Sequence, residues 1–210
     1  MVWSSWGLTG WAPPKGLTKM TTDKRNEILT TYVGDVHALV AHGLEAIDRQ
    51  VENLKDVSHQ DAKTVVNAAK SMLEAQKSVL AARVEALGGS TTKPFKDAVS
   101  AIAGVAAGLI NAVRPSETVK SLRDDHTYFS HLGISFLLLH TTAAGLSDAE
   151  TEKLAEQGYR ETARLVMMLD NTLPKVTVEE LREDGTTVLD VADKTREMLK
   201  NAWNREKSTT

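Results

Sequence analysis

The residues of this chain best suited to chemistry are histidines, carboxylates and one tyrosine spread along predicted helices. They are His37, His42, Glu45, Asp125, His126, Tyr128, His131, His140 and Glu161. Imidazole and carboxylate groups are the usual ligands of iron in helical bundles, and they also act as general acids and bases. Their spacing therefore decides whether the chain can build a metal site.

A di-iron carboxylate site needs one Glu from each of two helices and a Glu-x-x-His pair from each of the other two. No histidine in this chain has a Glu three residues before it, and only His59 has an Asp there, in a predicted turn. His42 and Glu45 can share one helix face, whereas His37 and His42 lie about 140° apart around a helix. The complete di-iron signature is therefore missing. A reduced iron site, kept as an alternative, would use His126, Asp125, Glu161, His42 and Glu45.

Asp125, His126 and Tyr128 are predicted to form a buried polar cluster, with Glu161 nearby. Buried polar groups usually pair with one another, and such pairs fix how helices pack. We expect this role rather than a ligand role, and we expect no cofactor. The sequence predicts no catalytic residue, because it lacks a Gly-x-Ser-x-Gly motif, a phosphate-binding glycine loop and a predicted strand to carry either.

Apolar residues recur at three- and four-residue intervals over most of the chain, which predicts an all-α protein. Long helices are expected over residues 22–54, 59–87 and 147–172, and a long helical arm over 95–144 that Pro115 breaks or kinks; short helical segments follow. Their predicted ends are capping boxes at Ser58 and Ser147, glycine stops at Gly88 and Gly145, and a proline stop at Pro174. Long helices joined by short loops predict an antiparallel four-helix bundle.

The chain divides into three predicted parts, which are a tail over residues 1–20, the bundle over 21–175 and short C-terminal helices over 176–210. The tail contains Trp3, Trp6 and Trp11. Indole rings concentrated in a short segment usually mark a contact surface. We therefore expect the tail to bind a protein partner or to mediate self-association, with a membrane surface as the weaker alternative. Two further alternatives are that the tail folds onto its own bundle and that translation begins at Met20.

Composition narrows the classes of function. The net charge of −3 comes from 25 basic and 28 acidic residues without a basic stripe, so nucleic acid is not expected as a partner. The absence of cysteine excludes disulfides and thiolate chemistry and fits a cytoplasmic protein, as does the lack of a secretory signal. Two stretches lack charged residues, Ala98–Val113 and Tyr128–Leu146. Both fit buried helices better than a membrane span.

The layout resembles that of bacterial ferritin-like stress proteins of the YciE/YciF type, over about residues 28–174. The resemblance depends on the helix end Leu87-Gly88-Gly89 and on the run Asp125-His126-Thr127-Tyr128 ahead of Gly133. It implies a ferritin-like bundle with an extra short helix and a role in bacterial stress physiology. Asp125 and Tyr128 stand where the family has glutamates, which implies a relative that has lost most of its metal site.

The leading hypothesis is therefore a non-catalytic ferritin-like bundle that acts as a structural or interaction protein, as part of an assembly. One alternative is a metal-dependent redox protein that uses the reduced iron site. The other is a membrane-associated subunit that uses the uncharged stretches or the tryptophan-rich tail.

Removing residues 1–19 tests the docking role of the tail. A chain that begins at Met20 should keep its helicity and melting temperature while losing association with a partner, a membrane or further copies. Circular dichroism and sedimentation velocity measure the two properties. A collapse of the bundle with unchanged association would place the tail in the core instead.

Overall fold

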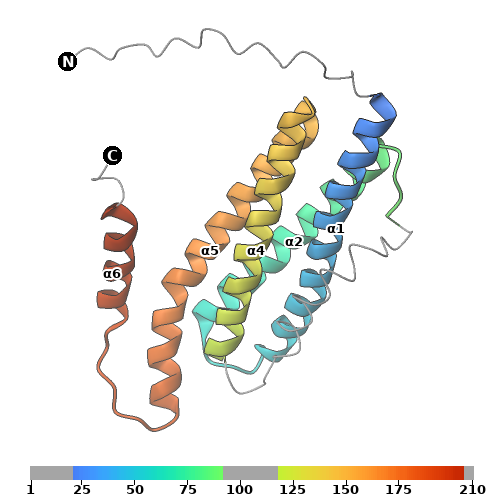
Figure 1. The fold of residues 1–210 in the computed structure, drawn as a ribbon. Coiled ribbons are helices and arrows are strands. Elements are labelled where there is room, and N and C mark those ends of the chain that lie inside the picture. Colours follow the sequence, from blue (N-terminus) through green and yellow to red (C-terminus); the bar gives the residue numbers. More distant parts are fainter. Residues whose placement is uncertain (1–20, 92–117, 206–210) are drawn as a thin grey trace, which may run out of the picture.

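The computed structural model describes residues 21–91 and 118–205 (Figure 1). These residues form the helices α1 (Thr22–Asn53), α2 (Gln60–Ala86), α4 (Thr118–Gly145), α5 (Ala149–Glu183) and α6 (Ala192–Arg205). The described part of the chain contains no strand, which confirms the all-α prediction. The predicted tail with its tryptophans and the stretch Ala98–Val113 lie outside the described residues.

Four of the helices form a bundle of two antiparallel hairpins, α1–α2 and α4–α5 (Figure 1). Contacts also join α2 to α5 and α1 to α4, and α6 contacts α5. The helices that touch in the bundle run antiparallel, so α2 and α4 point the same way (Figure 1). The end of α2 and the start of α4 therefore lie at opposite ends of the bundle. We call the end at which α2 and α4 finish the Asp148 end, and the opposite one the Glu180 end.

One apolar stripe of each bundle helix faces the interior, as the three- and four-residue spacing predicts. The largest fully buried side chains are Phe129, Phe136, Leu29, Leu39, Ile47, Leu73, Leu80, Leu122, Leu132, Leu139, Leu169 and Val33. Burial of a side chain of this size contributes about 1.5–3 kcal/mol. The shared core explains why helices with many polar residues stay together.

Three of the described helices, α2, α4 and α5, end with a left-handed residue that helps to satisfy their last carbonyl groups; in α5 this residue is Gly185, with a φ of 78°. Gly88 has a φ of 85°, and the amides of Gly88 and Gly89 donate to the carbonyls of Glu85 and Val84, as the Leu87-Gly88-Gly89 run predicts. At the end of α4 the left-handed residue is Ser147, with a φ of 57°. The prediction that this helix stops at Gly145 is confirmed, because Gly145 is its last helical residue.

The prediction of a capping box at Ser58 is wrong. The N-cap of α2 is His59, and its side chain makes no capping hydrogen bond. The Ser58 hydroxyl donates instead to Glu183 at the end of α5. The Ser58 side chain, which the local sequence predicts as the cap of α2, is therefore hydrogen-bonded to a carboxylate of another helix.

Pro174 does not end a helix, because α5 continues through it to Glu183. A proline inside a helix removes one hydrogen bond and crowds the preceding turn, at a cost of about 3 kcal/mol. The turns after Pro174 offset this cost by burying Val176 and Val178 and by contacts to other helices. The predicted short helix after residue 176 is thus the end of α5, and the predicted boundary at 175 falls inside it.

The same turns cap a neighbouring helix. Glu180 of α5 accepts hydrogen bonds from the backbone amides of Thr118, at 2.8 Å, and of Val119, at 3.3 Å. These amides belong to the first described turn of α4, and backbone amides in the first turn of a helix often bond to side chains. A carboxylate at a helix N-terminus also interacts favourably with the helix dipole. The last turns of α5 and the first turn of α4 therefore stabilise each other.

Gly43 allows α4 to approach α1 closely. The buried hydroxyl of Tyr128 donates to the carbonyl oxygen of Leu39 at 3.0 Å. A Cβ atom at position 43 would lie 2.0 Å from the Tyr128 hydroxyl oxygen, which is closer than atoms can approach. Only glycine at this position leaves room for the tyrosine ring.

Gly43→Ala should lower the free energy of unfolding by about 2–4 kcal/mol, because Tyr128 must move and loses both packing and its hydrogen bond. Urea denaturation measures the change. Gly145→Ala is the matched control, since its Cβ would meet nothing within 4 Å. It should be neutral or stabilising by up to about 1 kcal/mol. Equal effects of the two substitutions would contradict the close approach.

Candidate functional site

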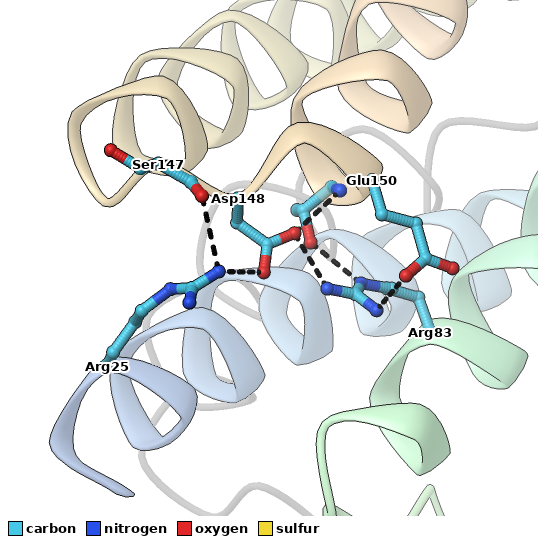
Figure 2. A network of polar contacts seen from close by, with 6 residues as sticks. Arg25, Arg83, Ser147, Asp148 and Glu150 are labelled. Carbon is cyan, nitrogen blue, oxygen red and sulfur yellow. Dashed lines mark hydrogen bonds and ion pairs between the residues drawn. The ribbon is translucent and has the colours of Figure 1, made fainter. Parts of the chain in front are cut away.

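The Asp148 end contains a buried arginine whose donors all point at α5 (Figure 2). Arg83 of α2 is 8% exposed. Its Nη2 donates to Asp148 Oδ1 at 2.7 Å, its Nη1 to Glu150 Oε2 at 2.6 Å and its Nε to Thr151 Oγ1 at 2.7 Å. A buried charge is tolerated only when it is paired and hydrogen-bonded. Each guanidinium nitrogen of Arg83 meets that condition.

A second arginine binds the other oxygen of the same carboxylate. Arg25 of α1 donates from Nη2 to Asp148 Oδ2 at 2.7 Å and to the Ser147 carbonyl oxygen at 3.4 Å (Figure 2). Burial acts to raise the pKa of Asp148, but hydrogen bonds from Thr151 and the charges of both arginines lower it below its ordinary value. One carboxylate thereby joins α1, α2 and the start of α5. We call this group, with Glu150, the Asp148 clamp.

The sequence predicts a cap at this place but assigns it to the wrong residue. Asp148, not Ser147, is the N-cap of α5, and it accepts from the Thr151 amide at 2.9 Å. Glu150, expected to complete the capping box, pairs with Arg83 instead. Arg25 and Arg83 are absent from the predicted site residues. The signal for Arg83 is its place next to Leu80, Val84 and Leu87 on the apolar face of its helix.

Arg83→Met should lower the free energy of unfolding by about 3–5 kcal/mol, because it removes one of the two charges that pair with buried Asp148. Chemical denaturation at neutral pH measures the loss. Arg160→Met is the control, since Arg160 pairs with Glu156 on the exposed side of α5. Its loss should stay below about 0.5 kcal/mol. A loss for Arg83→Met as small as the control's would show that the clamp does not stabilise the bundle.

At the Glu180 end, His59 lies between two carboxylates of α5. The imidazole is 3% exposed, with Nδ1 3.1 Å from Glu179 Oε2 and Nε2 3.4 Å from Glu183 Oε2. Both ring nitrogens can donate at once only when the ring is protonated. The exposed Lys175 adds a contact to Asp61 of α2. The end of α5 therefore holds the start of α2 as well as the start of α4.

Asp125 of α4 is a half-buried acid whose Oδ2 is shielded from solvent. Burial raises its pKa to about 7, the adjacent Asp124 adds to the rise, and the amide of Gln50 on α1 partly offsets it. Asp125 Oδ2 and Gln50 Nε2 are both buried without a hydrogen-bond partner of normal geometry. Burial and the charge of Asp125 also raise the pKa of Tyr128. This group can hold or release a proton near neutral pH.

The predicted cluster of Asp125, His126 and Tyr128 is divided between two sides of α4. Asp125 and Tyr128 face α1, as their contacts with Gln50 and Leu39 show. His126 faces α5 instead, with Nε2 3.1 Å from Asp170 Oδ1 and a side chain that is 33% exposed. The structure thus brings two of the three residues together.

The residues of the predicted iron site also have separate surroundings. Glu161 on α5 accepts hydrogen bonds from Gln76 at 3.3 Å and from Gln157 at 2.8 Å. Glu45 is exposed, and His42 Nε2 is buried without a partner among the described residues. Over residues 21–91 and 118–205, no group of three or more His, Asp or Glu side chains is placed to hold a metal ion. The structure therefore does not assemble these residues into one ligand set.

Comparison of the chain with protein-family models, curated proteins and solved structures gives no significant match. Among the described helices, none is both long and apolar enough to cross a membrane. This holds for α4 despite the uncharged stretch Tyr128–Leu146 within and just after it. The geometry of the bundle is thus the basis on which a function can be proposed.

Asp125→Asn should make the free energy of unfolding depend less on pH. Between about pH 4 and pH 7, folded Asp125 keeps a proton that unfolded Asp125 releases, so stability from this group falls as the pH rises. The variant should lose that slope and exceed the natural chain in stability at pH 8 by about 1–3 kcal/mol. Denaturation at pH 5, 6, 7 and 8 measures it. The control is Glu45→Gln, because Glu45 is exposed. If Asp125→Asn leaves the dependence of stability on pH unchanged, the raised pKa of Asp125 is contradicted.

Proposed function

We propose that this chain is a non-catalytic, ferritin-like helical bundle that acts as a structural protein by associating with further copies of itself through α4. The uncharged outer face of α4 carries the proposal. Ile134, Leu137 and Leu138 are 54%, 46% and 56% exposed. Their spacing places them on one face of the helix. The stretch Tyr128–Leu146 contains no Asp, Glu, Lys or Arg.

The outer face of a surface helix normally carries charged residues. A group of exposed apolar side chains without charges usually marks a protein contact. A second copy of the chain fits this surface because two-fold association places the same face on both partners. Two uncharged faces can come together without burying an unpaired charge, which would be costly.

The order and direction of the helices support the ferritin-like part of the proposal. Antiparallel hairpins joined by one long connection between opposite ends are typical of ferritin-like bundles. The Asp148 clamp and the contacts of Glu179, Glu180 and Glu183 at the Glu180 end use polar groups to hold helices, which fits a scaffold better than a reactive site. A role in stress physiology, and the alternative of an iron-dependent redox protein, rest on the resemblance to YciE/YciF-type proteins.

Leu138→Glu should weaken self-association at least about tenfold, which corresponds to about 1.4 kcal/mol, because the two-fold contact would then bury like charges. Sedimentation velocity over a hundredfold range of concentration measures the dissociation constant. Val79→Glu is the matched control, because Val79 is 52% exposed but lies on α2. This control should associate as the natural chain does.

A natural chain that stays monomeric at every concentration would contradict the proposal, as would equal effects of the two variants. The chain beginning at Met20 separates this face from the tail. Association that survives the truncation and is lost with Leu138→Glu belongs to α4.

A further inference from the structure

A groove of about 280 Å³ opens between α2 and α5. Its walls are formed by Ala75, Val79, Leu80 and Leu154. Phe136 of α4 closes it from the interior. This ring is 1% exposed and packs against the backbone of Gly158, where a Cβ would lie 2.3 Å from its Cε1. The groove therefore has apolar walls and a rigid aromatic base.

One carboxylate in this groove has only neutral partners. Glu161 accepts from Gln76 Nε2 at 3.3 Å and from Gln157 Nε2 at 2.8 Å. Both donors are amides, and among the described residues no ion pair joins Glu161 to a cation, including Lys153, which also lines the groove. The other acid that lines the groove, Glu150, is paired with Arg83 in the Asp148 clamp. Glu161 is therefore the negative charge that a bound molecule would meet.

Beside Glu161, Gln76 has an acceptor that is not satisfied. Its side chain lines the groove and is 2% exposed, and its Oε1 is buried without a hydrogen-bond partner. The amide orientation follows from the bond between Nε2 and Glu161. The reversed orientation would place two acceptor oxygens together. Since buried polar atoms are nearly always paired, an unpaired oxygen next to an uncompensated carboxylate indicates a place for a donor.

We propose that the groove binds a small organic cation with a primary ammonium group and an unbranched apolar body. The ammonium has three donors and a positive charge, which suit Glu161 and the oxygen of Gln76. The apolar body would lie along Ala75, Val79 and Leu154. The groove is close in volume to the smallest ligand pockets of proteins, which favours a body of about six carbons. This site is separate from the outer face of α4 and does not depend on self-association.

Titration of the isotope-labelled full chain with hexylammonium chloride, followed by amide chemical shifts, tests the proposal. Hexylammonium should shift the amides of Ala75, Val79 and Gly158 with a dissociation constant on the order of 1 mM, as expected for a ligand of this size. Hexanoate and 1-hexanol have the same body without the cation, and both should bind at least tenfold more weakly. Equal binding of the three probes, or no shifts at these amides, would overturn the proposal.

Two variants and a control locate the binding. Glu161→Gln keeps the side-chain shape but removes the charge, and should weaken hexylammonium binding at least tenfold. Ala75→Phe fills the groove while keeping the charge, and should also abolish the shifts, which keeps the test valid if Glu161→Gln does not fold. Glu156→Gln removes an equivalent charge from the exposed side of α5 and should bind normally. Binding that neither groove variant weakens would also overturn the proposal.

Discussion

The buried carboxylate of Asp148 is the group on which the arrangement of the two hairpins depends. Its oxygens bind guanidinium groups from α1 and α2, and it also caps α5 (Figure 2). An ionised carboxylate away from water requires such partners, because desolvation without them would cost several kcal/mol. The two arginines in turn fix the positions of α1 and α2 along the bundle axis relative to the loop between α4 and α5. Hydrophobic burial favours a bundle of some kind, whereas this pairing selects one register.

The opposite end depends on the same helix. The last turns of α5 supply a cap for α4 through Glu180 and partners for His59 at the start of α2. These contacts exist only because α5 continues past Pro174, and they explain why the helix tolerates that residue. α5 is therefore the common partner of the other three bundle helices: of α2 at both ends, of α1 through the Asp148 clamp and of α4 along its length.

The polar groups at both ends of the bundle point inward or toward neighbouring helices, which leaves two surfaces of different chemistry for contacts with other molecules. The outer face of α4 is apolar and uncharged and suits a large, self-complementary contact. The groove between α2 and α5 is small, with apolar walls and one uncompensated carboxylate, and suits a small cation. Buried core residues such as Phe129 and Phe136 lie beneath these surfaces.

The sequence by itself determined the helical character of the described segments, their apolar faces, the left-handed stop at Gly88 and the lack of Glu-x-x-His pairs, because each depends on residues within a few positions of one another. Only the tertiary structure decided that Asp148 is the cap, that α5 passes through Pro174 and that His126 faces away from Asp125 and Tyr128. The partners concerned are distant in sequence: Arg83 and Asp148 are 65 residues apart, and Arg25 and Asp148 are 123 apart. Local spacing indicates which face of a helix is buried. Which charged group from another helix meets that face depends on the relative position of the helices, and a long-range ion pair can outweigh a local propensity of about 1–3 kcal/mol.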